Sequence, residues 1–215
     1  MIKAVFFDVG ETLIDERRLW TSWADYLGVP FDKLFTTLDR CILQGLHHRQ
    51  VFEILQPGFD LDAARRKRAQ MGNPDLPMAG DLYPDAVACL TALKSRGAMV
   101  GIAGNQRAAA VALLASFGIV ADTIASSEEW KIEKPSPLFF EQTCAVSHLA
   151  PAEIAYVGDR LDNDVLPARA VGMCAVFLRR GPWARVHATR PEAQLATITI
   201  DSLDELIPAL AGELC

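Results

Sequence analysis

The chain has 215 residues, and its 21 basic and 27 acidic side chains give a formal net charge of −6 at pH 7. Because 51% of the residues are hydrophobic and only 22% are charged, the composition excludes an intrinsically disordered chain. The length suits one domain with an additional segment, or two small domains, and it is sufficient to bury a large core.

The charge pattern and the apolar segments argue against nucleic-acid and membrane partners. An acidic chain is poorly suited to wrapping a polyanion, and its basic cluster at residues 65–68 points in all directions on a helix, so we interpret that cluster as a solvated surface. The near-apolar stretch at residues 108–121 is shorter than the about 20 residues that a membrane span needs. The N-terminal apolar run is too short for a signal peptide, and the five scattered cysteines lack zinc spacing. We therefore expect a cytoplasmic protein with reduced thiols.

Short apolar runs alternate with helical patterns along most of the chain. Five runs predict buried β-strands: residues 4–7, 98–103, 123–125, 154–157 and 174–178. The helix expected between Pro84 and Gly97 would turn Val87, Leu90 and Leu93 inward. Because the strands are apolar throughout and helices separate them, we predict an α/β fold. Its core would be a Rossmann-like, doubly wound parallel sheet with helices on both faces.

Residues 16–79 interrupt this alternation with helical periodicity and no convincing strand. Trp20, Trp23 and Leu27 fall on one helical face, and we interpret this aromatic stripe as the core of the segment rather than a ligand cage. A further predicted helix places four residues on one face: Leu34, Leu38, Ile42 and Leu46. We therefore predict an inserted helical domain of residues 16–79 within an α/β core of residues 1–15 and 80–215.

Acidic residues follow two of the predicted strands. Asp8 follows the first strand, Asp159 follows the fourth, and Asp164 lies five residues further along. Because ligands of open parallel sheets bind beyond the carboxyl ends of the strands, we expect these carboxylates to converge at one edge. Such carboxylates repel one another unless a cation neutralises them, and oxygen ligands suit Mg²⁺. At the same edge, Lys134 would balance charge and hold an anion.

The order and spacing of four motifs resemble those of the haloacid dehalogenase-like hydrolase superfamily. The family's first motif, an apolar strand ending in D-x-D-x-T, corresponds to residues 6–12. Its second motif, an apolar strand ending in Ser or Thr, corresponds to residues 100–105. Its lysine motif corresponds to Lys134-Pro135, and its G-D-x(4)-D motif corresponds to residues 158–164. The resemblance covers almost the whole chain and implies that the insertion is the helical type-1 cap of that family.

The resemblance also implies a Mg²⁺-dependent phosphatase acting on small phosphorylated metabolites. Asp8 would be the nucleophile that forms an aspartyl-phosphate, and Lys134 would neutralise both Asp8 and the phosphoryl group. The implied metal ligands are the Asp8 carboxylate, the Gly10 carbonyl and Asp159, with Asp164 positioning a metal-bound water.

Two positions depart from the family pattern. Gly10 stands where the family's phosphatases carry a second Asp, which protonates the leaving group and later activates water. Such general acid–base groups typically contribute about 10²–10⁴-fold in rate. Glu11 could substitute only if the loop turns its side chain inward. Gly104 stands where Ser or Thr would contact the phosphoryl oxygen, so we expect its backbone N–H and the Asn105 amide to bind the substrate.

These departures keep two other functions open. The family's 2-haloacid dehalogenases also lack the second Asp, although they use no Mg²⁺ and typically lose the Gly-Asp pair that this chain retains at Gly158-Asp159. A catalytically weakened relative that binds a phosphorylated ligand or partner is the third hypothesis. His47, His48 and Arg49 are candidate substrate contacts in the insertion, although we interpret them first as surface residues. The sequence predicts neither the physiological substrate nor the oligomeric state.

Overall fold

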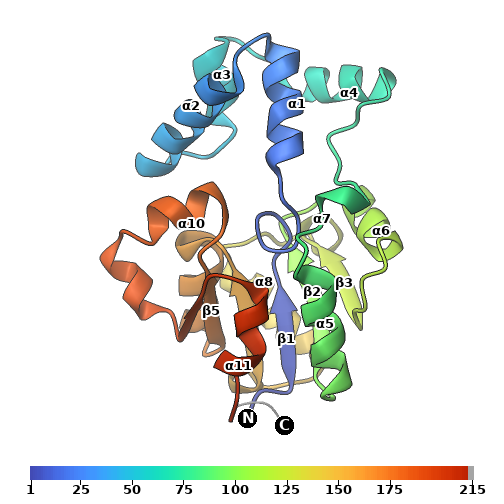
Figure 1. Ribbon diagram of the computed structural model, residues 1–215, viewed down its shortest axis with the longest axis vertical. Helices are drawn as coiled ribbons and strands as arrows, with labels where there is room; N and C mark the ends of the chain where they lie inside the picture. Colours follow the sequence, from blue (N-terminus) through green and yellow to red (C-terminus); the bar gives the residue numbers. More distant parts are fainter. Residues whose placement is uncertain (213–215) are drawn as a thin grey trace. The chain divides into compact units, whose positions relative to one another are not determined.

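The computed structural model describes residues 1–212, which form two compact units (Figure 1). One unit contains Met1–Asp15 and the chain from Met78 onward, and the other contains Glu16–Pro77. Residues 78 and 79 therefore belong to the first unit, whereas the sequence places them in the insertion. Hydrogen bonds to Asp81 account for this, since its carboxylate accepts from the Met78 N–H and its carbonyl accepts from the Asp15 N–H, both at 2.8 Å.

The first unit is built on a six-stranded sheet. Its strands, in spatial order, are β3 (Thr123–Ser126), β2 (Met99–Gly104), β1 (Ala4–Phe7), β4 (Ile154–Gly158), β5 (Cys174–Leu178) and β6 (Ile198–Ile200). Each neighbouring pair is parallel, so the carboxyl ends of all these strands lie along one edge. β1 is buried over its whole length between β2 and β4. The predicted α/β fold with a parallel sheet is confirmed.

Helices cover both faces of this sheet. On one face, residues of β1 such as Val5 and Phe7 share a core with α5 (Ala86–Ser95), α6 (Ala108–Ser116) and α11 (Leu206–Ala209). On the other face, Ala4 and Phe6 share a core with α8 (Pro137–Ser147), α9 (Leu166–Ala170) and α10 (Gly181–His187). The shorter elements are α7 (Ser127–Trp130), the π-helical turn η3 (Leu161–Val165) and the 3₁₀ turns η1 (Ala79–Asp81), η2 (Pro151–Glu153), η4 (Pro191–Leu195) and η5 (Leu203–Glu205).

The second unit consists of helices joined by loops. The helices are α1 (Arg17–Leu27), α2 (Phe31–Leu43), α3 (Gln50–Leu55) and α4 (Leu61–Gln70). Trp23 of α1 meets Phe52 of α3 edge-on with ring centroids 4.8 Å apart, and Phe52 stacks on Phe59 at 5.5 Å. Trp20 and Trp23 are both buried. The aromatic stripe therefore belongs to the core of the helical unit.

The predicted solvated surface of residues 65–68 is wrong for Arg68. The side chain of Arg68 is buried, and its guanidinium carbon lies 3.8 Å from the centre of the Trp23 ring. Asp75 forms an ion pair with Arg65 at 3.0 Å and lies 3.7 Å from Arg68. The aromatic face and the carboxylate compensate Arg68 for the water that it loses.

Three details of the predicted elements also differ. Leu46 is exposed because α2 ends at Leu43. Val87 is partly exposed. The buried face of α5 contains Ala86, Leu90 and Leu93, so Ala86 takes the core position that the sequence predicts for Val87. The strand β6 escaped prediction because its three residues are too few to show a period. No helix within residues 1–212 has both the length and the apolar character to span a membrane.

Candidate active site

Carboxylates from separate strand ends meet at the carboxyl edge of the sheet. Asp8 follows β1 directly, and its backbone N–H donates to the Val157 carbonyl of β4 at 2.9 Å. Asp159 follows β4, which runs parallel to β1 with Phe7 in register with Val157. One carboxylate oxygen each from Asp8, Asp159 and Asp164 lies within 4.8 Å of the other two. Residues that are far apart in the sequence are therefore brought to one point.

Lys134 joins this cluster through its ammonium group. Its Nζ donates to Oδ1 of Asp8 at 2.6 Å and to Oδ1 of Asp164 at 2.5 Å. The residue is only 2% exposed, and its Nζ lies 5.4 Å from the centre of the Tyr156 ring. The lysine is thus a buried counter-charge shared by two carboxylates.

Two glycines leave room for these carboxylates. A Cβ placed on Gly104 would lie 2.6 Å from Oδ1 of Asp8, and a Cβ placed on Gly158 would lie 2.4 Å from the carboxyl carbon of Asp164. Both distances are well inside van der Waals contact. A side chain at either glycine would displace a carboxylate or the backbone beside it.

The cluster carries uncompensated negative charge and is largely buried. Three carboxylates face one ammonium group, which leaves two negative charges unbalanced when all are ionised. Burial, followed by the Asp164 and Asp8 carboxylates, raises the pKa of Asp159 well above its usual value. Burial disfavours the charge on Lys134, but the same two carboxylates outweigh that effect and raise the pKa of the lysine. The raised pKa of Lys134 reflects the excess of acid over base, whereas that of Asp159 reflects burial first and this excess second.

This set of donors fits a hard divalent cation. Carboxylate oxygens are ligands that Mg²⁺ prefers in proteins. Oδ2 of Asp159 is buried and has no hydrogen-bond partner, which is costly for an ionised oxygen unless something coordinates it. A cation at this oxygen would remove that cost and balance the remaining charge. Asp8, Asp159 and Asp164 are therefore suited to hold the predicted Mg²⁺.

Asp164 is presented by the π-helical turn η3, a type of turn that is frequent at functional sites. Its Oδ2 accepts from the backbone N–H of Arg160 at 3.0 Å. The next backbone N–H, of Leu161, donates to Nδ1 of His187 in α10 at 3.1 Å. The sequence carries no signal for His187, which lies 26 residues from its partner in a helix that matches no motif.

Gly104 ends β2, and Asn105 follows it, as the sequence analysis places them. The Asn105 side chain bonds twice to the backbone of Lys134. Its Nδ2 donates to the Lys134 carbonyl at 2.9 Å, and its Oδ1 accepts from the Lys134 N–H at 2.8 Å. Asn105 therefore braces the segment that carries the lysine, a role that the sequence does not show because the two residues are 29 positions apart.

Glu11 is turned inward from the loop after β1. Its φ of +54° lies in the left-handed region, which costs a residue other than glycine of order 1 kcal/mol. Its side chain is buried, and Oε2 accepts from the Tyr83 hydroxyl at 2.7 Å. Gly181 makes room for it, since a Cβ there would lie 2.7 Å from the same oxygen. After burial and the two aspartates, Glu11 adds to the raised pKa of Asp159.

The remaining candidates lie in two loops. Gly10 precedes Glu11 in the tight turn after β1, where it forms an isolated parallel bridge with Ile14. His47, His48 and Arg49 lie between α2 and α3 in the helical unit. His47 and Arg49 are exposed, and the Arg49 N–H donates to Nδ1 of His47 at 3.2 Å.

Comparison with known proteins places this arrangement in a family. A family model described as haloacid dehalogenase-like hydrolase matches residues 2–172. Glyceraldehyde 3-phosphate phosphatase of Methanopyrus kandleri is 29% identical over 96% of each chain, and (S)-2-haloacid dehalogenase 4A of Burkholderia cepacia is 33% identical over 60% of this chain and 55% of its own. The crystal structure of a HAD phosphatase from Thermococcus onnurineus has a TM-score of 0.62 at 21% identity over the full length of both chains. The chain therefore belongs to the haloacid dehalogenase-like hydrolase family, as its four motifs predict.

Proposed function

We propose that the chain is a Mg²⁺-dependent phosphatase that cleaves small phosphate monoesters through an aspartyl-phosphate on Asp8. The observation that carries this proposal is the shared lysine: Nζ of Lys134 bonds to both Asp8 and Asp164, beside a buried Asp159 oxygen with no partner. A nucleophilic carboxylate, a fixed cation and a vacant oxygen ligand are the groups that such a reaction uses.

The first half of the reaction transfers the phosphoryl group to Asp8. A carboxylate oxygen of Asp8 forms a bond to phosphorus while the ester P–O bond breaks, and the alcohol leaves after taking a proton. In the second half, a water oxygen attacks phosphorus, the bond to Asp8 breaks, and inorganic phosphate is released. The two steps regenerate the carboxylate and consume one water.

Lys134 and the metal site would reduce the repulsion between the two anions. Lys134 neutralises the carboxylate charge of Asp8 in the free enzyme. It remains beside the phosphoryl oxygens after transfer, because Asp164 holds its Nζ and Asn105 holds its backbone. Mg²⁺, held by Asp8, Asp159, Asp164 and the Gly10 carbonyl, would supply further positive charge to the phosphoryl oxygens. The backbone N–H of Gly104 is proposed as a phosphoryl donor.

Proton transfer is the unusual step in this chain. Gly10 has no side chain to protonate a leaving alkoxide, and the nearest acidic residue in the loop, Glu11, already accepts a hydrogen bond from Tyr83. We therefore propose that good leaving groups are hydrolysed faster than poor ones. Acyl and aryl phosphates need less protonation than alkyl phosphates.

The relatives support a phosphatase of small metabolites. The Methanopyrus kandleri protein, matched over nearly its whole length, is named for glyceraldehyde 3-phosphate, so a three-carbon sugar phosphate belongs among the substrates to test. We propose that the helical unit, Glu16–Pro77, is the cap that selects the substrate. Cys41, Cys89 and Cys144 are free thiols, as expected for the proposed cytoplasmic location.

A 2-haloacid dehalogenase is the second candidate, favoured by the partial match to the Burkholderia cepacia enzyme and by Gly10. The buried acid Asp159 opposes it, since the metal-independent reaction has no use for a third carboxylate. A non-catalytic relative that binds a phosphorylated ligand is the third candidate. It is opposed by the intact Asp8–Lys134 pair.

A panel of phosphate-release assays distinguishes these functions. Acyl, aryl, nucleotide and sugar phosphates, including glyceraldehyde 3-phosphate, are tested with and without Mg²⁺, alongside halide release from 2-chloropropionate. A phosphatase releases phosphate only with the metal and loses activity in Asp8→Asn, because an amide cannot form the aspartyl-phosphate. Metal-independent halide release identifies the dehalogenase, and tight phosphate-ester binding without turnover identifies the non-catalytic relative.

A further inference from the structure

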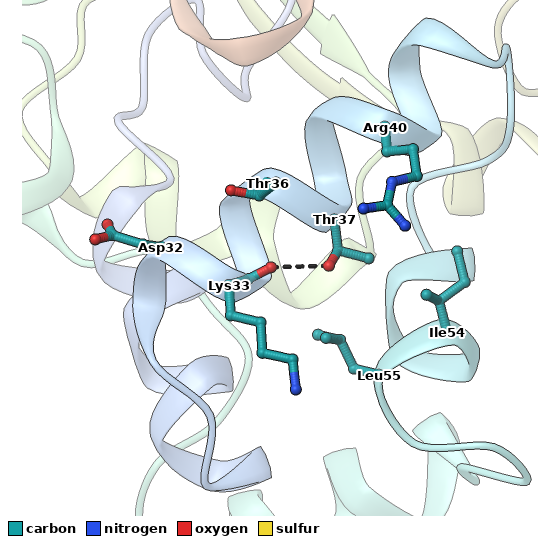
Figure 2. Close-up of a pocket in the computed structure, with 7 residues that line it drawn as sticks. All are labelled: Asp32, Lys33, Thr36, Thr37, Arg40, Ile54 and Leu55. Atoms are coloured by element: carbon teal, nitrogen blue, oxygen red, sulfur yellow. Dashed lines mark hydrogen bonds between the residues drawn. The ribbon is translucent and has the colours of Figure 1, made fainter.

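The helical unit contains a pocket of its own, with a volume of about 410 Å³, between α2 and α3 (Figure 2). Lys33, Thr37 and Arg40 line it from α2, and Ile54 and Leu55 line it from α3. Pockets that bind small molecules have volumes of about 300–1,000 Å³. No motif of the sequence analysis points to this pocket.

Two cations border the pocket without a counter-charge. Lys33 and Arg40 are seven residues apart, so two turns of α2 place them on the same helical face. Within residues 1–212, neither side chain takes part in an ion pair or a hydrogen bond. Asp32 also borders the pocket, but Figure 2 shows its carboxylate pointing away from both cations. An anion placed between Lys33 and Arg40 would meet two unpaired positive charges.

The opposite wall of the pocket is apolar. Ile54 is 44% exposed, which is high for a large aliphatic residue, and Leu55 beside it is half-buried. The buried Thr37 forms part of the lining between the two cations, with its hydroxyl donating to the Lys33 carbonyl at 2.8 Å. A ligand with an aliphatic portion would cover the exposed side chain of Ile54 and remove apolar surface from water.

The charge of the helical unit also favours an anion. Residues 16–77 contain nine basic and eight acidic residues, whereas the rest of the chain contains 12 basic and 19 acidic residues. The pocket therefore lies in a part of the molecule whose net charge does not repel anions. The remainder of the chain, with its acidic excess, repels them except where a buried cation such as Lys134 compensates.

We propose that this pocket binds a small organic dianion whose two acidic groups are joined by a short aliphatic chain. One acidic group pairs with Lys33, the other pairs with Arg40, and the chain between them packs on Ile54 and Leu55. The Cα atoms of the two cationic residues are about 10 Å apart along α2, by the rise of the helix. A six-carbon dicarboxylate matches that span once the cationic side chains lean toward it. The proposal concerns a second ligand site and does not rest on the proposed phosphatase activity.

Adipate is the probe, titrated into the whole chain by isothermal calorimetry and by NMR, with inorganic phosphate as the compact comparison anion. We expect saturable adipate binding with shifts in α2 and α3, and weaker binding of phosphate as judged by the shifts in these two helices, because phosphate can also bind at the proposed active site. Lys33→Gln and Arg40→Gln are each expected to weaken adipate binding about two- to fivefold, as for exposed ion pairs. The double variant is expected to weaken it about four- to 25-fold, the product of the two single effects. Ile54→Ser is expected to weaken the binding of adipate but not of phosphate.

Arg66→Gln and Lys67→Gln are the matched controls, because both residues are exposed in α4 and carry the same charge. They are expected to leave the affinity for adipate unchanged. The proposal is overturned when adipate does not saturate the protein, or when the control variants weaken binding as much as Lys33→Gln, which would indicate diffuse charge attraction. It is also overturned when Lys33→Gln and Arg40→Gln both bind adipate with the affinity of the unmodified chain.

Discussion

A Cβ placed on Gly104 would lie 2.6 Å from Oδ1 of Asp8, the same oxygen that accepts a hydrogen bond from Nζ of Lys134 at 2.6 Å. The proposed nucleophile therefore occupies space that any side chain at position 104 would need. The family's second motif, to which residues 100–105 correspond, ends in Ser or Thr at this position. In this chain the family's usual residue would conflict with the position of Asp8.

We predict that both Gly104→Ala and Gly104→Ser lower activity, because each adds the same Cβ and pushes Asp8 away from Lys134. Misplacing a reacting group by about 1 Å can cost about 10²-fold in rate. The measurement is kcat on an aryl phosphate, with Tm recorded to show that the variants fold. Gly80→Ala is the control, since a Cβ at Gly80 meets nothing within 4 Å. Faster turnover in Gly104→Ser would contradict the prediction and would show that Asp8 moves freely.

Mg²⁺ is expected to stabilise the folded chain. It is also expected to reverse the order of stability of the unmodified chain and the Asp159→Asn variant. Without metal, Asp159→Asn should have a Tm equal to or above that of the unmodified chain, because it removes one of the three crowded carboxylates. With Mg²⁺ at about 100 times its Kd, the unmodified chain gains about 2.7 kcal/mol and becomes the more stable of the two. Melting curves in EDTA and in Mg²⁺ test this. If millimolar Mg²⁺ changes the Tm of neither protein, the proposed metal site is ruled out.

His187 is expected to make the fold sensitive to mild acid. Burial lowers its pKa to about 4, while Asp162 opposes the shift and Arg190 and Arg160 support it. Because the folded pKa lies below the unfolded value of 6.5, the unfolded chain binds more protons between these values. The contribution of His187 to stability is complete above about pH 6.5 and is lost as the pH falls toward about 4. By the size of the shift, it amounts to about 3 kcal/mol at most.

The test compares the unmodified chain with His187→Gln, which keeps an acceptor for the Leu161 N–H but does not titrate. Denaturant unfolding at pH 7 and pH 5 should show a smaller loss of stability in the variant. His47→Gln, at an exposed position of the helical unit, is the control and should retain the pH dependence of the unmodified chain. If His187→Gln loses as much stability as the control between pH 7 and pH 5, protonation of His187 is not the cause of the acid sensitivity.

The strands were more predictable than the contacts at the site. Each of the five predicted strands lies within one residue of an observed strand at both ends, because buried parallel strands are continuous apolar runs that helices separate. The position of Asp8, Asp159 and Asp164 at one edge follows from the same topology. What the sequence does not show are contacts between distant residues, such as the bond from Tyr83 to Glu11 or the bracing of Lys134 by Asn105.

Conformation and packing at single residues were equally hidden. A Glu in left-handed backbone has no signature in composition or periodicity, and Gly181, which makes room for Glu11, lies 170 residues further along the chain. Arg68 is similar: its burial depends on Trp23 and Asp75, which approach it only in the folded helical unit. Such features require the tertiary structure.

Restoring the missing acid tests the proposed mechanism directly. We predict that Gly10→Asp raises turnover on alkyl phosphates more than on aryl phosphates, because an alkoxide needs a proton to leave whereas an aryl oxide needs little help. The gain on alkyl phosphates is expected to fall within the about 10²–10⁴-fold that general acid–base groups contribute. In the unmodified chain, hydrolysis of the aspartyl-phosphate also lacks a base, so the intermediate should accumulate and give a burst of released alcohol. Gly10→Asp should lower the amplitude of that burst, because it speeds hydrolysis of the intermediate.

Gly10→Asn is the matched control, since it has a similar size and cannot transfer the proton. Melting curves with and without Mg²⁺ must first show that both variants fold and bind the metal. If Gly10→Asp meets these conditions and gains nothing on alkyl phosphates, another group already supplies the proton. Glu11→Gln then decides, because Glu11 is the buried acid of the same loop and lies within electrostatic reach of Asp159. A selective loss of alkyl phosphatase activity in Glu11→Gln would assign the proton transfer to Glu11, whereas unchanged activity would exclude it.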